Sequence, residues 1–250
     1  MLHYNRFGTG NQKILFIHGN LASARWWGPV MERMDSFYDM VAVDLPGYGE
    51  SAPAADDVTI ASHATNLIGL LGTLDFTPCI VVGHSLGGAV AMQLAADVPD
   101  LMDALVLVDS APVTGMGPFD YDVLEQVVAN EPLLQTSLKA TLALDIPVSL
   151  MDMIMADCLT AKKSFIPNSR ALTGIDFTKV AAVFEKPVLV LQGEKDPVIS
   201  PEVAAHTAAA YPHNQLIVLP QSGHNPQIEV PDLFVQVLRD FIVEITQKSM

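Results

Sequence analysis

The chain has 250 residues, of which 50% are apolar and 16% charged, and its formal net charge at pH 7 is −15. This composition supplies a large buried core and excludes a disordered chain, while the negative charge opposes binding to nucleic acid or to an anionic membrane surface. The 2 cysteines, Cys79 and Cys158, are too few for a disulfide scaffold or a zinc ribbon.

The N-terminal segment Met1–Arg6 lacks the basic region and apolar run of a secretory signal. Every apolar run in the chain is far shorter than the ~20 residues that cross a bilayer. We therefore expect a cytoplasmic protein with no membrane partner.

Short runs of apolar, often β-branched residues recur along the chain, each bounded by Gly, Pro, Asp or Ser. Continuous apolarity predicts strands that are buried on both faces of a parallel sheet. The runs are Ile14–Ile17, Met40–Val43, Cys79–Val82, Ala104–Val108, Val188–Leu191 and Leu216–Leu219. Helical spacing between them predicts helices over Ile60–Leu74, Ala89–Ala96, Pro201–Tyr211 and Pro231–Ile245. This alternation predicts an α/β fold, a doubly wound and mostly parallel sheet.

One long segment, residues 113–180, interrupts this alternation with helical patterns only. Because a structureless loop of that length is uncommon in a compact domain, we expect an inserted helical lid. The predicted division is a core of residues 1–112 and 181–250 and a lid of residues 113–180. The lid helices are expected over Asp120–Asn130, Pro132–Leu144, Pro147–Leu159 and Ala161–Leu172.

The strongest chemical signal is Gly83-His84-Ser85-Leu86-Gly87, a G-x-S-x-G motif between a buried strand and a helix. A serine on that sharp turn adopts a strained backbone, for which the glycines leave room. Its oxygen then projects beside a helix N-terminus, which stabilises developing negative charge. We therefore expect Ser85 to be a nucleophile.

A serine hydroxyl needs a base, and the best candidate among the 7 histidines is His224. It lies between the last predicted strand and the last predicted helix, at the carboxyl edge of the sheet. His84, next to the serine, and His18, in a tight turn, are expected to be structural hydrogen-bonding residues. The other histidines have ordinary surface or helix contexts.

The base needs a carboxylate that fixes its tautomer and stabilises its cation, and two aspartates follow predicted strands. Asp196 stands in a Gly-x-x-Asp-x-Val setting, and Asp109 follows the preceding strand. Asp196 is favoured, and Asp109 stays open as the alternative acid or as a carboxylate that caps a loop.

The oxyanion of an acyl-transfer reaction needs two backbone donors. We expect them to be the amide of Leu86, which follows the serine, and the amide of Asn20, in the loop after the first predicted strand. The side chain of Asn20 either lines the pocket or is an ordinary turn residue.

These motifs together resemble the α/β-hydrolase superfamily with a lid inserted after the sixth strand. The matching segments are His18–Asn20, Asp44–Ser51, Gly83–Gly88, Gly193–Asp196 and Gly223–His224. The resemblance implies a sheet of eight strands. The short segment Met1–Gly10 has room for at most one strand of a hairpin before the strand that would be the third in the family. It also implies that some members place the acid where Asp109 stands. Family members that attack a saturated carbon carry an aspartate in the turn where this chain has Ser85, whereas a serine suits attack on an acyl carbon.

The resemblance implies a Ser-His-Asp serine hydrolase, and we favour a small, largely uncharged ester or lactone substrate. The alternatives are a carbon–carbon bond hydrolase, another acyl hydrolase (thioesterase or perhydrolase), or a non-catalytic small-molecule receptor. No cofactor or metal is required. Candidate substrate contacts, each equally interpretable as core packing, are Trp26, Trp27, Met151 and Met155. Arg25 suggests a carboxylate contact, but a surface arginine is the simpler interpretation.

Overall fold

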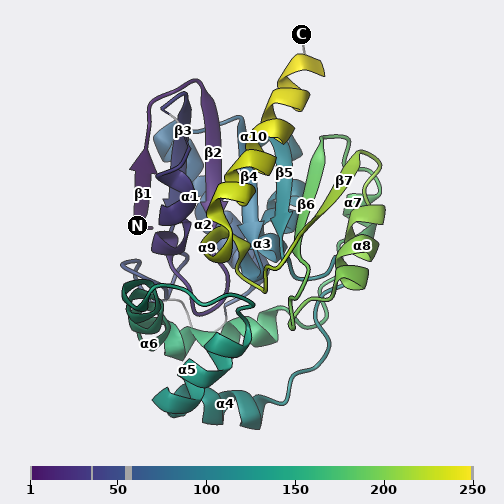
Figure 1. Cartoon of the computed structure of the whole chain (residues 1–250). Helices are drawn as coiled ribbons and strands as arrows, with labels where there is room; N and C mark the ends of the chain where they lie inside the picture. The colour runs from purple at the N-terminus through teal and green to yellow at the C-terminus, as the bar shows by residue number, and fades with distance from the viewer. Residues whose placement is uncertain (1, 35, 54–57, 249–250) are drawn as a thin grey trace.

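The computed structural model describes residues 2–34, 36–53 and 58–248 (Figure 1). Within these residues the strands form a 7-stranded sheet in the order β1-β3-β2-β4-β5-β6-β7. β1 pairs antiparallel with β3, and the other neighbouring pairs are parallel. The strands are β1 (Tyr4–Phe7), β2 (Gln12–Ile17), β3 (Tyr38–Val43), β4 (Cys79–His84), β5 (Met102–Val108), β6 (Val188–Gly193) and β7 (Asn214–Leu219). The predicted α/β fold is confirmed, and β1 is the single arm for which the N-terminus has room.

Helices cover both faces of the sheet (Figure 1). One face carries α1 (Gly28–Met31) and α10 (Pro231–Lys248), and the other carries α2 (Ile60–Leu74), α3 (Leu86–Asp97) and α8 (Pro201–Ala209). The shorter helical turns are η1 (Ala24–Trp27), η2 (Pro99–Leu101), α7 (Thr178–Ala181) and α9 (Pro226–Glu229). Of the described helices, none is both long enough and apolar enough to span a membrane.

Local sequence sets the ends of α2. Thr59 and Ser62 form a reciprocal capping box, with each side chain accepting the backbone N–H of the other residue. The helix ends at Asp75, whose φ of 50° is left-handed and stops the helical repeat. Its predicted bounds therefore agree with the structure.

The sheet separates two apolar cores, and alternate residues of its strands enter each. Leu15 and Val81 pack with the α2, α3 and α8 side, whereas Phe16 and Val82 pack with the α1 and α10 side. This two-sided burial explains the unbroken apolar runs of the central strands. The prediction of a strand buried on both faces is wrong for β7, because β7 is an edge strand and its Val218 is 42% exposed.

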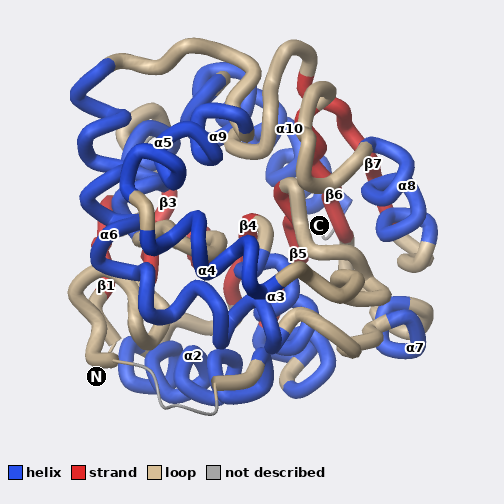
Figure 2. The backbone as a smooth tube through the Cα atoms, turned by 90° about the horizontal axis from the view of Figure 1, so that it is seen from below, coloured by secondary structure: helices blue, strands red, loops and turns tan. Residues whose placement is uncertain are grey.

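The segment 113–180, here called the insertion, contains α4 (Tyr121–Ala129), α5 (Glu131–Ala140) and α6 (Val148–Ala171). Figures 1 and 2 show these three helices across the lower edge of the sheet. The two helices expected over Pro147–Leu159 and Ala161–Leu172 are one continuous α6. Thr160, at the expected break, bonds its hydroxyl to Ala156 O and stays within the helix.

Candidate active site

The strand order reverses direction at β2, which lies between β3 and β4. In an open α/β sheet this reversal creates a crevice beyond the carboxyl ends of the strands. Ile17 and Gly83 are register partners, so the loop that begins at His18 adjoins the turn that carries Ser85. The fold therefore brings the predicted nucleophile and oxyanion loop together.

Ser85 occupies the strained turn that the motif predicts. Its φ of 51° and ψ of −115° lie outside the regions that side-chain-bearing residues favour. A Cβ added at Gly83 would collide with Gly87 O, and one at Gly87 would collide with Ile17 O. Glycine is therefore required at both positions for β2, β4 and α3 to approach so closely.

His224 and Asp196 lie in contact. His224 Nδ1 is 2.7 Å from Asp196 Oδ2, and Asp196 Oδ1 accepts the amides of Val198 at 2.7 Å and Ile199 at 3.2 Å. Burial acts to raise the pKa of Asp196, but these hydrogen bonds, that from His224 foremost, hold it below the usual value. An ionised Asp196 only accepts hydrogen bonds, so Nδ1 of His224 carries the proton and Nε2 is left unprotonated.

Asp109 lies beside this pair but bonds elsewhere. It is fully buried, and its Oδ1 accepts the amide of Gly193 at 2.7 Å. Burial, together with the nearby charge of Asp196, raises the pKa of Asp109 well above its usual value. The two candidate acids therefore have pKa shifts of opposite direction.

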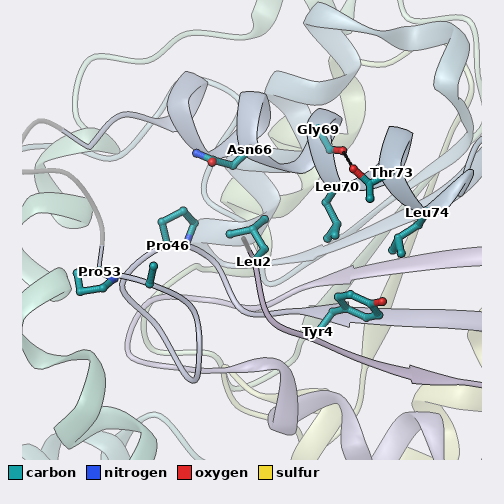
Figure 3. A pocket seen from close by; sticks show the side chains of 10 residues that line it. Leu2, Tyr4, Pro46, Pro53, Asn66, Gly69, Leu70, Thr73 and Leu74 are labelled. Carbon is teal, nitrogen blue, oxygen red and sulfur yellow. Dashed lines mark hydrogen bonds between the residues drawn. The ribbon is translucent and has the colours of Figure 1, made fainter.

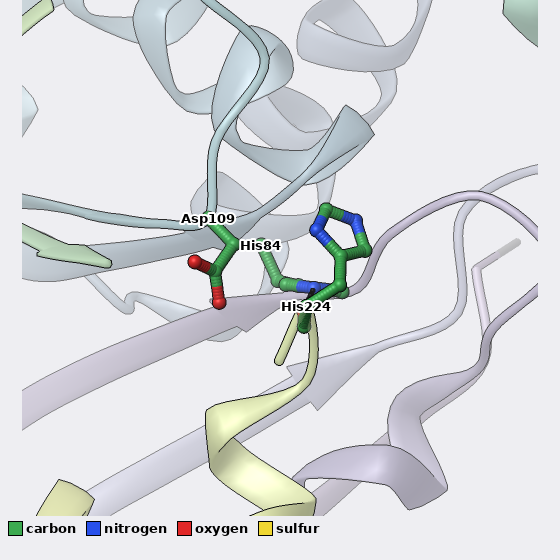
Figure 4. Close-up of side chains that lie close together, drawn as sticks. All are labelled: His84, Asp109 and His224. Carbon is green, nitrogen blue, oxygen red and sulfur yellow. Dashed lines mark hydrogen bonds between the residues drawn. The ribbon is translucent and has the colours of Figure 1, made fainter. Parts of the chain in front are cut away.

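His84, Asp109 and His224 form a buried cluster (Figure 4) in which one donor atom from each lies within 4.8 Å of the others. His84 Nε2 is 2.8 Å from His224 O, and His224 Nδ1 is engaged by Asp196. Asp109 Oδ1 in turn accepts the amide of Gly193. Hydrogen-bonding contacts within the protein therefore engage one ring nitrogen of each histidine and one carboxylate oxygen of Asp109.

The two histidines expected to be structural both bond to the backbone. His18 Nδ1 is 2.7 Å from Gly19 O, and its Nε2 accepts the amide of Leu45 at 3.0 Å. Burial lowers the pKa of His18 to about 4 and that of His84 to about 3, so both are neutral.

The loop after β2 contains the expected oxyanion donor at Asn20. Among the described residues, the structure records no hydrogen-bond partner for the backbone amides of Asn20 and Leu86. The side chain of Asn20 is engaged, because its Nδ2 donates to Phe165 O at 3.1 Å and to Ser169 Oγ at 3.2 Å, both on α6. Its Oδ1 accepts from Tyr48 Oη at 2.7 Å. Asn20 therefore joins the oxyanion loop to the insertion.

A second junction between this loop and α6 was not predicted. Asp157, buried on α6, accepts hydrogen bonds from Ser23 Oγ at 2.8 Å and Trp26 Nε1 at 3.1 Å. It also forms an ion pair with Arg25, so the structure pairs that cation with the insertion. Two aspartates, Asp152 and Asp157, interrupt the apolar stretch around Met155, and the sequence alone does not distinguish the buried one from the exposed one.

Ser85 and His224 open onto one cavity of about 320 Å³, although no hydrogen bond between their side chains is recorded. Such contacts often tighten only when substrate binds. Apolar residues of the insertion form much of its wall: Met116, Phe119, Leu124, Val127, Leu134, Leu138, Phe165 and Leu172. The described lining residues include no Asp, Glu, Lys or Arg.

The structure places one of the four expected substrate contacts on the cavity wall. Trp26 lines the cavity, but Trp27, Met151 and Met155 are not among the described lining residues. Trp27 is fully buried, with its ring 4.9 Å from that of Phe16. The two methionines face the apolar core that α6 shares with the α2 and α3 side. The helical spacing of Met151 and Met155 predicts that they lie on a buried face of their helix, but it does not predict whether that face borders the core or the cavity.

A larger hollow of about 540 Å³ lies at the sheet edge, between β1 and α2 (Figure 3). Its described lining residues, among them Leu2, Tyr4 and Leu70, include no Ser, Cys, His, Asp or Glu. The hydroxyl of Thr73 therefore has no base among these lining residues, and the smaller cavity at Ser85 is the candidate active site.

Several known proteins resemble this chain. The model of the "Alpha/beta hydrolase family" matches residues 14–237. The chain is 26% identical to the pimeloyl-[acyl-carrier protein] methyl ester esterase of Yersinia enterocolitica, over 96% of each chain. It is 23% identical to the 2-hydroxy-6-oxononadienedioate/2-hydroxy-6-oxononatrienedioate hydrolase of a Pseudomonas species, over 96% of this chain and 91% of that one. The solved thermophilic esterase from Thermogutta terrifontis has a TM-score of 0.85 at 24% identity, covering 98% of this chain and 93% of that one.

Proposed function

The chain belongs to the alpha/beta hydrolase family, as the sequence motifs predict, and within it we propose that this protein is a serine hydrolase that cleaves a small, uncharged carboxylic ester or lactone. One observation carries the proposal. A strained Ser85 and a His224 hydrogen-bonded to Asp196 face the same apolar cavity. Strain at a serine and a carboxylate-bound histidine are what nucleophilic catalysis at a carbonyl needs.

In the proposed reaction, Ser85 Oγ attacks the substrate carbonyl carbon while His224 Nε2 takes its proton. The amides of Asn20 and Leu86 hold the oxyanion, and Asp196 stabilises the imidazolium through Nδ1. His224 then gives the proton to the leaving alkoxide oxygen, which leaves an acyl-enzyme. A water molecule, deprotonated by His224, releases the acid and restores Ser85. These steps need no cofactor.

The cavity favours an uncharged substrate. Because none of the described lining residues is Asp, Glu, Lys or Arg, a substrate carboxylate buried there would lack a countercharge. An ester or lactone with an apolar acyl part needs only the oxyanion amides as polar partners. We also propose that the protein acts in the cytoplasm.

A second candidate, carbon–carbon bond hydrolysis, is favoured by the Pseudomonas relative, whose name describes a dienedioate hydrolase. Such a dicarboxylate substrate fits poorly in a cavity without a described cationic lining residue. A panel of short esters, lactones and vinylogous diketones separates the two candidates. Turnover of the diketones alone would favour the second.

The main test compares the wild-type protein with Ser85→Ala on p-nitrophenyl acetate and butyrate. We expect burst release of p-nitrophenol from the wild type and a loss of several orders of magnitude in the variant. Circular dichroism checks that the variant is folded. If the variant keeps more than roughly a tenth of the wild-type kcat, Ser85 is not the nucleophile. A wild type with no turnover of any substrate would favour a non-catalytic receptor.

A further inference from the structure

One carboxylate outside the predicted triad lies at the junction of the His224 loop and the insertion. Glu229 is the last residue of α9 and is half-buried. Its Oε1 accepts the amides of Gly223 at 3.0 Å and Asn225 at 3.2 Å. Its Oε2 accepts the amides of Ala143 at 2.7 Å and Leu144 at 3.1 Å. Four backbone N–H groups therefore converge on a single side chain.

The four amides belong to two segments that are distant in sequence. Gly223 and Asn225 flank His224, whereas Ala143 and Leu144 follow α5 in the insertion. These bonds also explain why α5 ends at Ala140 rather than at the predicted Leu144, because the last two amides bond to Glu229.

Further contacts join the same two segments. His224 N donates to Thr141 O at 2.8 Å, and Asn225 Nδ2 donates to Thr141 Oγ1 at 3.2 Å. A Cβ added at Gly223 would collide with Thr141 O, so the two backbones approach as closely as glycine allows. Residues 223–225 are thus held against residues 141–144.

A carboxylate suits this position better than any neutral side chain. It offers about four lone-pair positions and no donor, so it can accept all four N–H groups at once. Hydrogen bonds to an ionised acceptor are also stronger than those between neutral groups. A glutamine would place an NH₂ group against one pair of amides and would leave that pair without an acceptor.

We propose that Glu229 is a positioning residue that couples the insertion to the general base. Asp196 fixes the ring of His224 through Nδ1, and Glu229 fixes the backbone on either side of it. A displacement of residues 141–144 therefore displaces His224 relative to Ser85. The catalytic part of this inference rests on the proposed function, but the mechanical coupling does not.

The test uses Glu229→Gln, with Glu202→Gln as the matched control because Glu202 is exposed on α8. The first readout is kcat on p-nitrophenyl acetate, butyrate and octanoate. We expect Glu229→Gln to lower kcat about 10- to 100-fold, since a small misplacement of a catalytic group has an effect of that size. The loss should be the same factor for each acyl length, because proton transfer is common to all three. The control should match the wild type.

The second readout is amide hydrogen exchange, which needs no activity. We expect peptides covering 141–144 and 222–226 to exchange faster together in Glu229→Gln, with other regions of the protein unchanged. Faster exchange in one segment alone, or in neither, would overturn the coupling. A loss of kcat that varies with acyl length would show a distorted pocket and would overturn the positioning role.

Failure of the proposed function is recognised separately. If the wild type hydrolyses no ester and does not react with a fluorophosphonate, that function is wrong, and hydrogen exchange alone decides the coupling. If Glu229→Gln does not fold, Glu229→Asp serves instead, because it keeps the charge but is one methylene too short to reach both segments. Wild-type kcat and wild-type exchange in Glu229→Asp would overturn the proposal.

Discussion

Nδ1 of His224 lies 2.7 Å from Oδ2 of Asp196, while Oδ1 of the neighbouring Asp109 accepts a hydrogen bond from the amide of Gly193. The hydrogen bonds to Asp196 lower its pKa, and burial raises that of Asp109. Two carboxyl groups whose pKa values are driven apart by their surroundings are suited to different roles. The lowered pKa of Asp196 suits the proposed stabilisation of a His224 cation, whereas the raised pKa of Asp109 opposes that role.

We therefore expect unequal effects of removing the two charges. Asp196→Asn should lower kcat by up to ~10⁴-fold, because the amide favours the wrong tautomer of His224. Asp109→Asn should stay within about tenfold of the wild type, because His224 Nδ1 is engaged by Asp196 and an amide oxygen can still accept the Gly193 N–H. Both variants are compared at one pH on p-nitrophenyl butyrate, with circular dichroism as the folding control. A large loss of kcat in Asp109→Asn, together with a kcat close to wild type in Asp196→Asn, would assign the acid role to Asp109.

The raised pKa of Asp109 also predicts a pH-dependent stability difference. A group with a raised native pKa stabilises the fold below its usual pKa, near ~4, and loses this contribution as pH rises towards the native value. Asp109→Asn has no proton to lose. Its free energy of unfolding relative to wild type should therefore increase with pH, by up to about 1.4 kcal/mol per unit. Urea unfolding at pH 5, 6.5 and 8 measures this, and a pH-independent difference would contradict it.

Local patterns were enough to predict strands β2 to β7 and the sharp turn at Ser85. The apolar runs, the glycines around Ser85 and the Gly-His loop after β7 depend on neighbours in sequence. The strand order then explains why Ser85, His224 and Asp196 lie at one edge, since parallel strands end on the same side. The site roles of these residues remain predictions until they are tested by substitution.

Long-range contacts were not predictable from the same patterns. Asp157 meets Trp26 across 131 positions, and Glu229 meets Ala143 across 86. No local spacing identifies such partners, because they depend on how α6 and the turn after α5 lie against the sheet. Likewise, the spacing that placed Met155 on a buried face does not distinguish the core from the cavity.

Asp157 should support the oxyanion loop through its bonds to Ser23 and Trp26. Asp157→Ala leaves these two donors unpaired, and each buried donor left unpaired costs ~1–3 kcal/mol of stability. We also expect a lower kcat, because the same loop carries the Asn20 amide. Asp152→Ala, exposed on the same helix, is the control. Denaturant unfolding and ester kinetics test both effects, and equal values for the two variants would argue against a supporting role.

The insertion should set the preference for acyl length through the cavity wall. Leu134 lines the cavity on α5 and is 1% exposed, whereas Leu133 beside it is 40% exposed and is not among the described lining residues. Leu134→Ala removes wall volume, so longer acyl chains gain room that acetate cannot use. The kcat/KM ratio of p-nitrophenyl octanoate to acetate should rise about tenfold, the scale of one or two buried methylenes. Leu133→Ala should leave that ratio unchanged. A ratio that moves equally in both variants, or in neither, would show that α5 does not select the substrate.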